Sequence, residues 1–146
     1  MATNNQPNIL FILTDQQRQD SLAAYGNDWI ETPNLNALAE RSFVFENAYV
    51  SQPVCTPSRA SILTGQYPQT TGLVRNGITL GSNTHTIAEM ISETYLCGYY
   101  GKWHLGDDLV PQHGFEEWRS IEDWRETIPS NEKDRFLECD YDRWLR

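Results

Sequence analysis

The chain has 146 residues, of which 39% are hydrophobic, 21% are charged and 12% are aromatic, and its formal net charge is −9. This composition excludes an intrinsically disordered chain, and the length is that of one ordinary domain. The acidic balance argues against nucleic acid or an anionic membrane as a partner, because neither surface attracts a negatively charged protein.

The apolar and cysteine patterns predict a compartment. No apolar run approaches the ~20 residues that span a bilayer, and the first run, residues 9–13, has no basic residue before it as a signal peptide would. Cys55, Cys97 and Cys139 are an odd and sparse set, which favours reduced thiols over disulfides. The sequence therefore predicts a cytoplasmic protein without a membrane partner.

The first third of the chain predicts two strands and a helix. Continuous apolarity over residues 9–13 indicates a strand buried on both faces, as in a parallel sheet covered by helices. Thr32 and Pro33 have the pattern of an N-cap and a first helical residue, which predicts a helix from Pro33 to about Arg41. Aromatic and β-branched residues over 43–50 predict a second strand.

A second Thr-Pro pair, Thr56-Pro57, predicts another helix that Gly65 would end. Residues 66–83 are rich in Gly, Thr and Asn, and we expect a long loop there.

Further along, Thr86 and Glu89 form a candidate capping box at the start of a short helix. Residues 95–103 are predicted as a strand, interrupted by two glycines. The alternation of strands and helices along the whole chain indicates an α/β fold.

Cys55-Thr56-Pro57-Ser58-Arg59 is the most informative stretch. It places Cys55 immediately before a predicted helix, where unpaired N–H groups and the helix dipole favour a thiolate or a bound oxyanion. Arg59, four residues on, can extend a fixed positive charge toward the same helix end. The alternative is a small buried cysteine beside a surface arginine.

A second candidate pair is Lys102 and His104, which lie between Gly101 and Gly106. In a strand these two side chains would share one face and Trp103 would point to the other. Lysine can hold a charged oxygen, and histidine can also donate a proton to a leaving group. The alternative is an exposed lysine beside a structural histidine.

Asp15 and Gln16 follow the first predicted strand. Ligand sites in open α/β sheets lie outside the carboxyl ends of the strands, and a carboxylate and an amide oxygen suit a hard divalent cation. The alternative is ordinary loop polarity or a helix cap.

Together these stretches resemble the type I, formylglycine-dependent sulfatases of the alkaline-phosphatase-like superfamily. The resemblance rests on residues 8–16, 55–65 and 101–106 and extends from about residue 7 to 118. It implies a three-layer α/β/α sandwich with a mostly parallel central sheet, incomplete in this chain. We expect residues 1–146 to be the N-terminal part of the catalytic domain, with residues 119–146 forming a truncated, acidic, tryptophan-containing segment.

The resemblance also implies a mechanism. A separate maturation enzyme would oxidise Cys55 to formylglycine, and a hydroxyl of its hydrate would attack the sulfur of a sulfate ester. Asp15, Gln16 and an oxygen of the modified Cys55 would bind a divalent metal, usually Ca²⁺. Arg59 would orient the modified residue. Lys102 and His104 would bind sulfate oxygens and assist the leaving group.

The chain departs from the family pattern at two places. Many members have two consecutive aspartates where this chain has Asp15 and Gln16, and Gln occurs there in related phosphonate monoester and phosphodiester hydrolases. The stretch 92–95 is one residue short and lacks a customary glycine, which predicts a disturbed strand register before Lys102.

The family's catalytic domain is several times longer than 146 residues, and its remaining metal ligands lie downstream. We therefore expect the 146 residues alone to be inactive. Two alternatives stay open from the sequence: a phosphonate monoester or phosphodiester hydrolase of the same superfamily, and a non-catalytic, truncated fragment.

Overall fold

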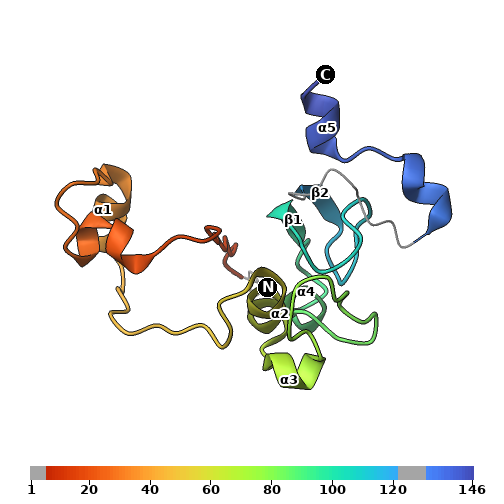
Figure 1. Ribbon diagram of the computed structural model, residues 1–146, viewed down its shortest axis with the longest axis horizontal. Helices are drawn as coiled ribbons and strands as arrows, with labels where there is room; N and C mark the ends of the chain where they lie inside the picture. Colours follow the sequence, from red (N-terminus) through yellow and green to blue (C-terminus); the bar gives the residue numbers. More distant parts are fainter. Residues whose placement is uncertain (1–5, 122–130) are drawn as a thin grey trace, which may run out of the picture. The chain divides into compact units, whose positions relative to one another are not determined.

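The structure of the protein is a computed structural model that describes residues 6–121 and 131–146 (Figure 1). The chain divides into two compact units, Met1–Ala48 and Tyr49–Arg146. Trp124, one of the tryptophans of the acidic segment, lies outside the described residues.

The first unit contains two short 3₁₀ helices, η1 (Gln19–Ser21) and η2 (Ala23–Tyr25), and the α-helix α1 (Pro33–Ala39). The helix predicted from Pro33 is confirmed, with Thr32 at its N-cap. The Thr32 hydroxyl does not cap the helix; it accepts from Ala23 N at 3.2 Å and donates to Asn36 Oδ1 at 3.1 Å. Proline in the first turn costs nothing, because the N–H that it lacks would have no partner there.

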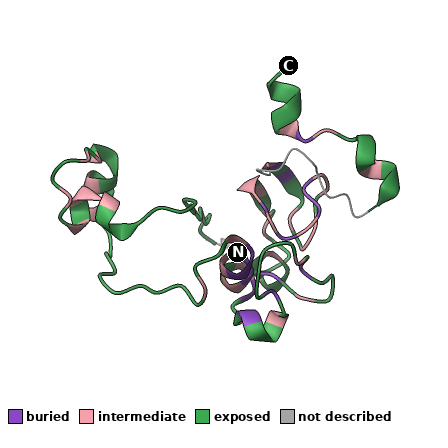
Figure 2. Cartoon of the chain, viewed as in Figure 1, coloured by how far each residue is buried: buried purple, intermediate pink, exposed green. Residues whose placement is uncertain are grey.

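The strand predicted over residues 9–13 is wrong. The segment has no regular secondary structure and no strand partner among the described residues, and its apolar residues are 44–83% exposed (Figure 2). A strand exists only where a neighbouring backbone completes its hydrogen-bond ladder, and β1 and β2 pair only with each other in the described part of the chain. The apolar run over residues 9–13 suggested a strand, but it could not show that a second strand was available to pair with it.

The strand predicted over residues 43–50 is also wrong, because side chains of the first unit occupy backbone groups that a ladder would use. Tyr25 Oη donates to the Phe45 carbonyl at 2.9 Å, and Gln19 Nε2 donates to the Glu46 carbonyl at 3.0 Å. These contacts hold the segment against η1 and η2 as irregular backbone.

The second unit contains the remaining described elements. In chain order they are α2 (Cys55–Thr64), α3 (Pro68–Thr71), α4 (Ile87–Met90), β1 (Gly98–Lys102), β2 (Glu117–Ile121), the 3₁₀ helix η3 (Glu132–Phe136) and α5 (Asp140–Trp144). The predicted helix at Thr56-Pro57 is confirmed, although Cys55 is its first residue rather than the residue before it. Gly65 ends it as predicted, with φ 67°.

Strands β1 and β2 form a parallel pair in which Tyr99 lies opposite Trp118 and Lys102 lies opposite Ile121. The strand predicted over 95–103 is therefore confirmed in its central part. The short stretch 92–95 forms a turn closed by a hydrogen bond from Tyr95 N to the Ser92 carbonyl (2.9 Å). After this turn the pairing of β1 with β2 runs without a break from Gly98 to Lys102.

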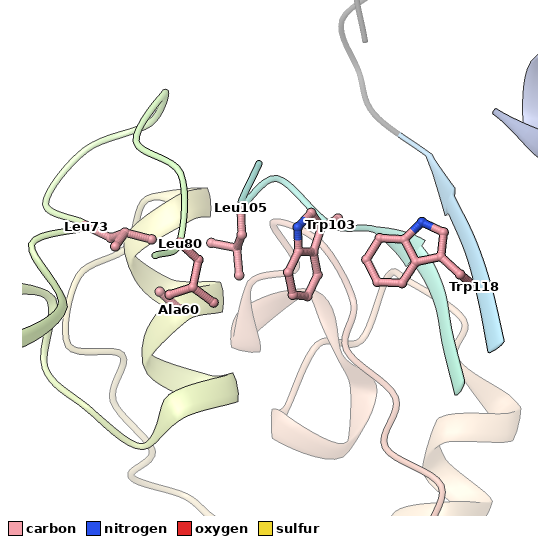
Figure 3. Close-up of a cluster of buried hydrophobic side chains, with 6 residues drawn as sticks. All are labelled: Ala60, Leu73, Leu80, Trp103, Leu105 and Trp118. Carbon is pink, nitrogen blue, oxygen red and sulfur yellow. The ribbon is translucent and has the colours of Figure 1, made fainter. Parts of the chain in front are cut away.

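The core of the second unit joins α2 to this sheet. Six buried side chains form it: Ala60, Leu73, Leu80, Trp103, Leu105 and Trp118. Figure 3 shows them in a row from Leu73 and Leu80 beside α2 to Trp118 on β2. The Tyr99 ring extends the cluster, since it meets Trp103 edge-on at 5.1 Å and stacks on Trp118 at 5.2 Å. Helices and a parallel strand pair around one core confirm the α/β class.

The predicted capping box is present at the start of α4. Thr86 N donates to Glu89 Oε2 at 2.8 Å, and the Thr86 hydroxyl accepts from Ala88 N. That hydroxyl also donates to the His113 carbonyl at 2.7 Å, which brings the turn at Gly114 against the helix.

We expect Gly114→Ala to destabilise the second unit more than Gly77→Ala. Both glycines have positive φ (81° and 79°), so alanine costs ~1–2 kcal/mol of backbone strain at each. A Cβ at Gly114 would also lie 2.8 Å from Glu89 N, whereas nothing lies within 4 Å at Gly77. That clash adds ~1–3 kcal/mol. Urea unfolding followed by tryptophan fluorescence measures the difference, and equal midpoints for the two variants would contradict it.

The C-terminal segment packs on β2. Arg119 Nη1 lies 3.3 Å from Oδ2 of Asp140, the first residue of α5. Cys55, Cys97 and Cys139 are free thiols. Burial raises the pKa of the Cys139 thiol, and the carboxylate of Asp142, whose Oδ2 lies 3.2 Å from the sulfur, also raises it. Cys139 is therefore a poor nucleophile at neutral pH.

Candidate active site

The N-terminus of α2 carries the candidate nucleophile. Cys55 is half-buried, and the preceding residue, Val54, has no side-chain oxygen to cap the helix. Asn76 supplies an acceptor from a loop twenty residues away, since its Oδ1 accepts from Thr56 N at 3.0 Å. The helix has ten residues, so the positive end of its dipole lies beside Cys55. Asn76 takes the N–H of Thr56, and Pro57 has none.

Arg59 is buried on the same helix, with 7% of its surface exposed. Its Nη1 donates to the Lys102 carbonyl at the end of β1 and lies 3.4 Å from Tyr99 Oη. Tyr99 Oη donates to the same carbonyl. The arginine that the sequence places near Cys55 therefore also joins α2 to the strand that carries Lys102.

Lys102 and His104 are half-buried, while Trp103 and Leu105 are completely buried. This alternation agrees with the predicted division of the segment into two faces. The strand does not continue to His104, because β1 ends at Lys102 and His104 has φ 58°. The chain turns there so that Leu105 can enter the core, where its carbonyl accepts from Leu80 N at 2.8 Å.

A direct hydrogen bond connects the two motifs. The hydroxyl of Thr56, the residue after Cys55, donates to the His104 carbonyl at 2.9 Å. With the bond from Arg59 to the Lys102 carbonyl, it fastens the first turns of α2 to the 102–104 segment. The structure thus brings together the segments that carry Cys55, Arg59, Lys102 and His104.

Asp15 and Gln16 lie in the first unit and are exposed, whereas Cys55 lies in the second. The predicted metal ligands are therefore divided between the two units. Their donor atoms fit a hard cation, because a carboxylate and an amide oxygen are adjacent in sequence and accessible. Across residues 6–121 and 131–146, no group of three or more His, Cys, Asp or Glu side chains could hold a metal ion.

Sequence reasoning missed three residues that build the site: Thr56, Asn76 and Tyr99. The sequence pattern marked Thr56 only as a sign of a helix start. Its hydroxyl, next to Cys55 in the motif, could have indicated a role in the site. Asn76 and Tyr99 gave no signal, since their partners lie twenty and forty residues away in the chain.

Comparison with known sequences assigns the class. The sequence profile of the family named Sulfatase matches residues 7–145. The chain is 43% identical over 125 residues to an ulvan-active sulfatase of Formosa agariphila, covering 80% of this chain and 24% of that protein. It is 38% identical over 135 residues to arylsulfatase A of Bos taurus, covering 83% and 26%.

Solved structures agree with the sequence matches. One is BT4656 in complex with its substrate D-glucosamine-2-N,6-O-disulfate, with a TM-score of 0.70 and 33% identity over 77% of this chain and 22% of that one. Another is BT1596, a 2-O GAG sulfatase, with a TM-score of 0.58 and 29% identity over 74% and 23%.

These neighbours define an α/β structure of the alkaline-phosphatase-like fold, of which the described residues form an incomplete part. The chain belongs to the sulfatase family. It spans about a quarter of the length of the curated relatives described above. In the described part of the chain, no helix has both the length and the apolarity needed to cross a bilayer.

Proposed function

We propose that these residues form the nucleophile-bearing part of a sulfuric ester hydrolase. The observation that carries the proposal is the pair of hydrogen bonds, from Thr56 to the His104 carbonyl and from Arg59 to the Lys102 carbonyl. They place the two segments that carry the candidate reactive groups against each other. A cysteine at a helix N-terminus and a lysine–histidine segment together suit attack on a tetrahedral oxyanion ester.

Each residue has a role that its surroundings support. Cys55, matured to formylglycine by a separate enzyme, supplies the attacking oxygen, and the N-terminus of α2 stabilises the negative charge of the ester. Arg59, fixed by its bond to the Lys102 carbonyl, orients the modified residue. Lys102 binds a sulfate oxygen, and His104 binds another and donates a proton to the departing alcohol.

Asp15, Gln16 and an oxygen of the modified Cys55 would hold a divalent cation, for which Ca²⁺ is our proposal. Their oxygens are hard donors, which Ca²⁺ prefers. When bound, the cation would polarise the attacking hydroxyl and the ester oxygens. The substrate class is a sulfate ester of an alcohol, as the names of the relatives suggest.

A substrate comparison tests the proposal. We expect the full-length gene product, produced with a formylglycine-generating enzyme, to hydrolyse an aryl sulfate faster than the matching aryl phosphodiester or phosphonate monoester. Phenol release, measured on the same preparation, gives kcat/KM for each of the substrates. A higher kcat/KM for the phosphodiester or the phosphonate would contradict the sulfatase assignment and favour the chemistry of relatives that carry Gln at the position of Gln16.

A further inference from the structure

Thr56 lies where three segments of the second unit meet. Its side chain is completely buried at the start of α2. Its backbone N–H donates to Asn76 Oδ1 at 3.0 Å, and its hydroxyl donates to the His104 carbonyl at 2.9 Å. One residue thus links the turn after Cys55, the loop at Asn76 and the segment that carries His104.

The backbone of His104 needs such support. Its φ of 58° is left-handed, a conformation that costs a residue with a side chain about 1–2 kcal/mol. Such a residue persists only where its surroundings over-determine its conformation. Trp103 and Leu105 fix the chain on either side, since both are 0% exposed. The bond from Thr56 fixes the carbonyl between them.

We propose that Thr56 is a positioning residue that holds the left-handed backbone of His104 in register with the helix end that carries Cys55. The inference rests on the proposed function, in which His104 binds the ester and donates a proton. Thr56 acts only through His104, because its hydroxyl is committed to the His104 carbonyl and its side chain is fully buried.

A matched control lies at the other end of the same helix. Thr64 is also buried, and its hydroxyl donates to a backbone carbonyl, that of Ala60, at 2.7 Å. That acceptor belongs to α2 itself, and the hydroxyl also accepts from Gln66 N at 3.2 Å, just past the helix end. Both Thr64 bonds are therefore local and fix no distant segment. Thr56→Val and Thr64→Val each remove a buried hydroxyl that donates to a backbone carbonyl. Only Thr56→Val should affect His104.

Kinetics on the full-length gene product give the first test. We expect Thr56→Val to lower kcat about 10- to 100-fold with little change in KM, because small displacements of a reacting group cost rate rather than affinity. Thr64→Val should lower the melting temperature but keep kcat close to wild type. Thr56→Ser keeps the hydroxyl and should restore kcat. Equal kcat values for Thr56→Val and Thr64→Val would overturn the proposal.

The NMR signals of His104 give a test that needs no turnover. Residues 1–146 include three histidines, so histidine-selective labelling keeps the spectrum simple, and the signals that His104→Gln removes are those of His104. Thr56→Val should move the ring and Cα signals of His104 alone, and Thr64→Val should leave them in place. If wild type fails to hydrolyse sulfate esters, the proposed function fails, yet the NMR comparison still decides the role of Thr56. If Thr56→Val does not fold, displaced His104 signals in folded Thr56→Ser would overturn the proposal.

Discussion

Cys55→Ala is expected to reduce the sulfate ester turnover of the full-length gene product by about 10⁴-fold or more, which is the scale of removing a covalent nucleophile. The half-buried Cys55 opens α2, where the positive end of the helix dipole favours an anion, and Arg59 of the same helix is fixed by its bond to the Lys102 carbonyl. Alanine keeps the helix but cannot be converted to formylglycine. Initial rates with an aryl sulfate measure the loss.

Cys97→Ala is the matched control for that substitution. Cys97 is also a half-buried free thiol of the second unit, but it lies just before β1, and its sulfur lies 4.0 Å from the Ala88 carbonyl. We expect its variant to keep wild-type turnover. A Cys55→Ala enzyme that retains a tenth of the wild-type rate would show that another group is the nucleophile.

Trp103→Ala is expected to destabilise the second unit by about 3–5 kcal/mol, the usual cost of removing a buried tryptophan side chain. Trp103 is 0% exposed and lies between Leu105 and Trp118 in the core. Because a domain is stable by only ~5–15 kcal/mol, this variant should lose a large part of its stability and unfold at much lower urea concentration. Far-UV circular dichroism and urea titration measure the loss.

Two further variants separate packing from hydrogen bonding at this position. Trp103 Nε1 is buried and has no hydrogen-bond partner among the described residues. Trp103→Phe, which keeps an aromatic ring and removes that N–H, should therefore cost much less than Trp103→Ala. Trp29 is 79% exposed in the first unit, and Trp29→Ala should cost almost nothing. A Trp103→Ala variant as stable as Trp29→Ala would contradict the core assignment.

Local signals in the sequence predicted the helices well. The Thr32-Pro33 pair, the Gly65 stop and the box of Thr86 and Glu89 all mark helix ends in the structure. These signals work because proline in the first turn, glycine at the stop and the capping box all depend on the backbone of residues close in the chain.

The strands predicted over residues 9–13 and 43–50 were wrong, because local signals do not identify a strand's partner. An apolar or β-branched run shows that a segment could join a sheet, but the ladder depends on a partner elsewhere in the chain. β1 was predicted in part because its run lies between local breaks, and its partner β2 was not identified.

In the candidate site, too, the sequence identified local motifs but not the contacts between distant residues. Cys55, Arg59, Lys102 and His104 were identified from two short motifs, whereas the bonds that join those motifs were not. The contact from Thr56 to the His104 carbonyl spans 48 residues, and the left-handed backbone of His104 follows from the burial of its neighbours. Both features arise only when the core forms.

The mass of the tryptic peptide 42–59, which contains Cys55, tests the proposed nucleophile most directly. We expect this peptide, taken from the full-length gene product made in cells with an active formylglycine-generating enzyme, to carry an aldehyde in place of the Cys55 thiol. A second sulfatase made in the same cells serves as the positive control. A peptide with only an unmodified thiol, beside a modified control, would contradict the role proposed for Cys55.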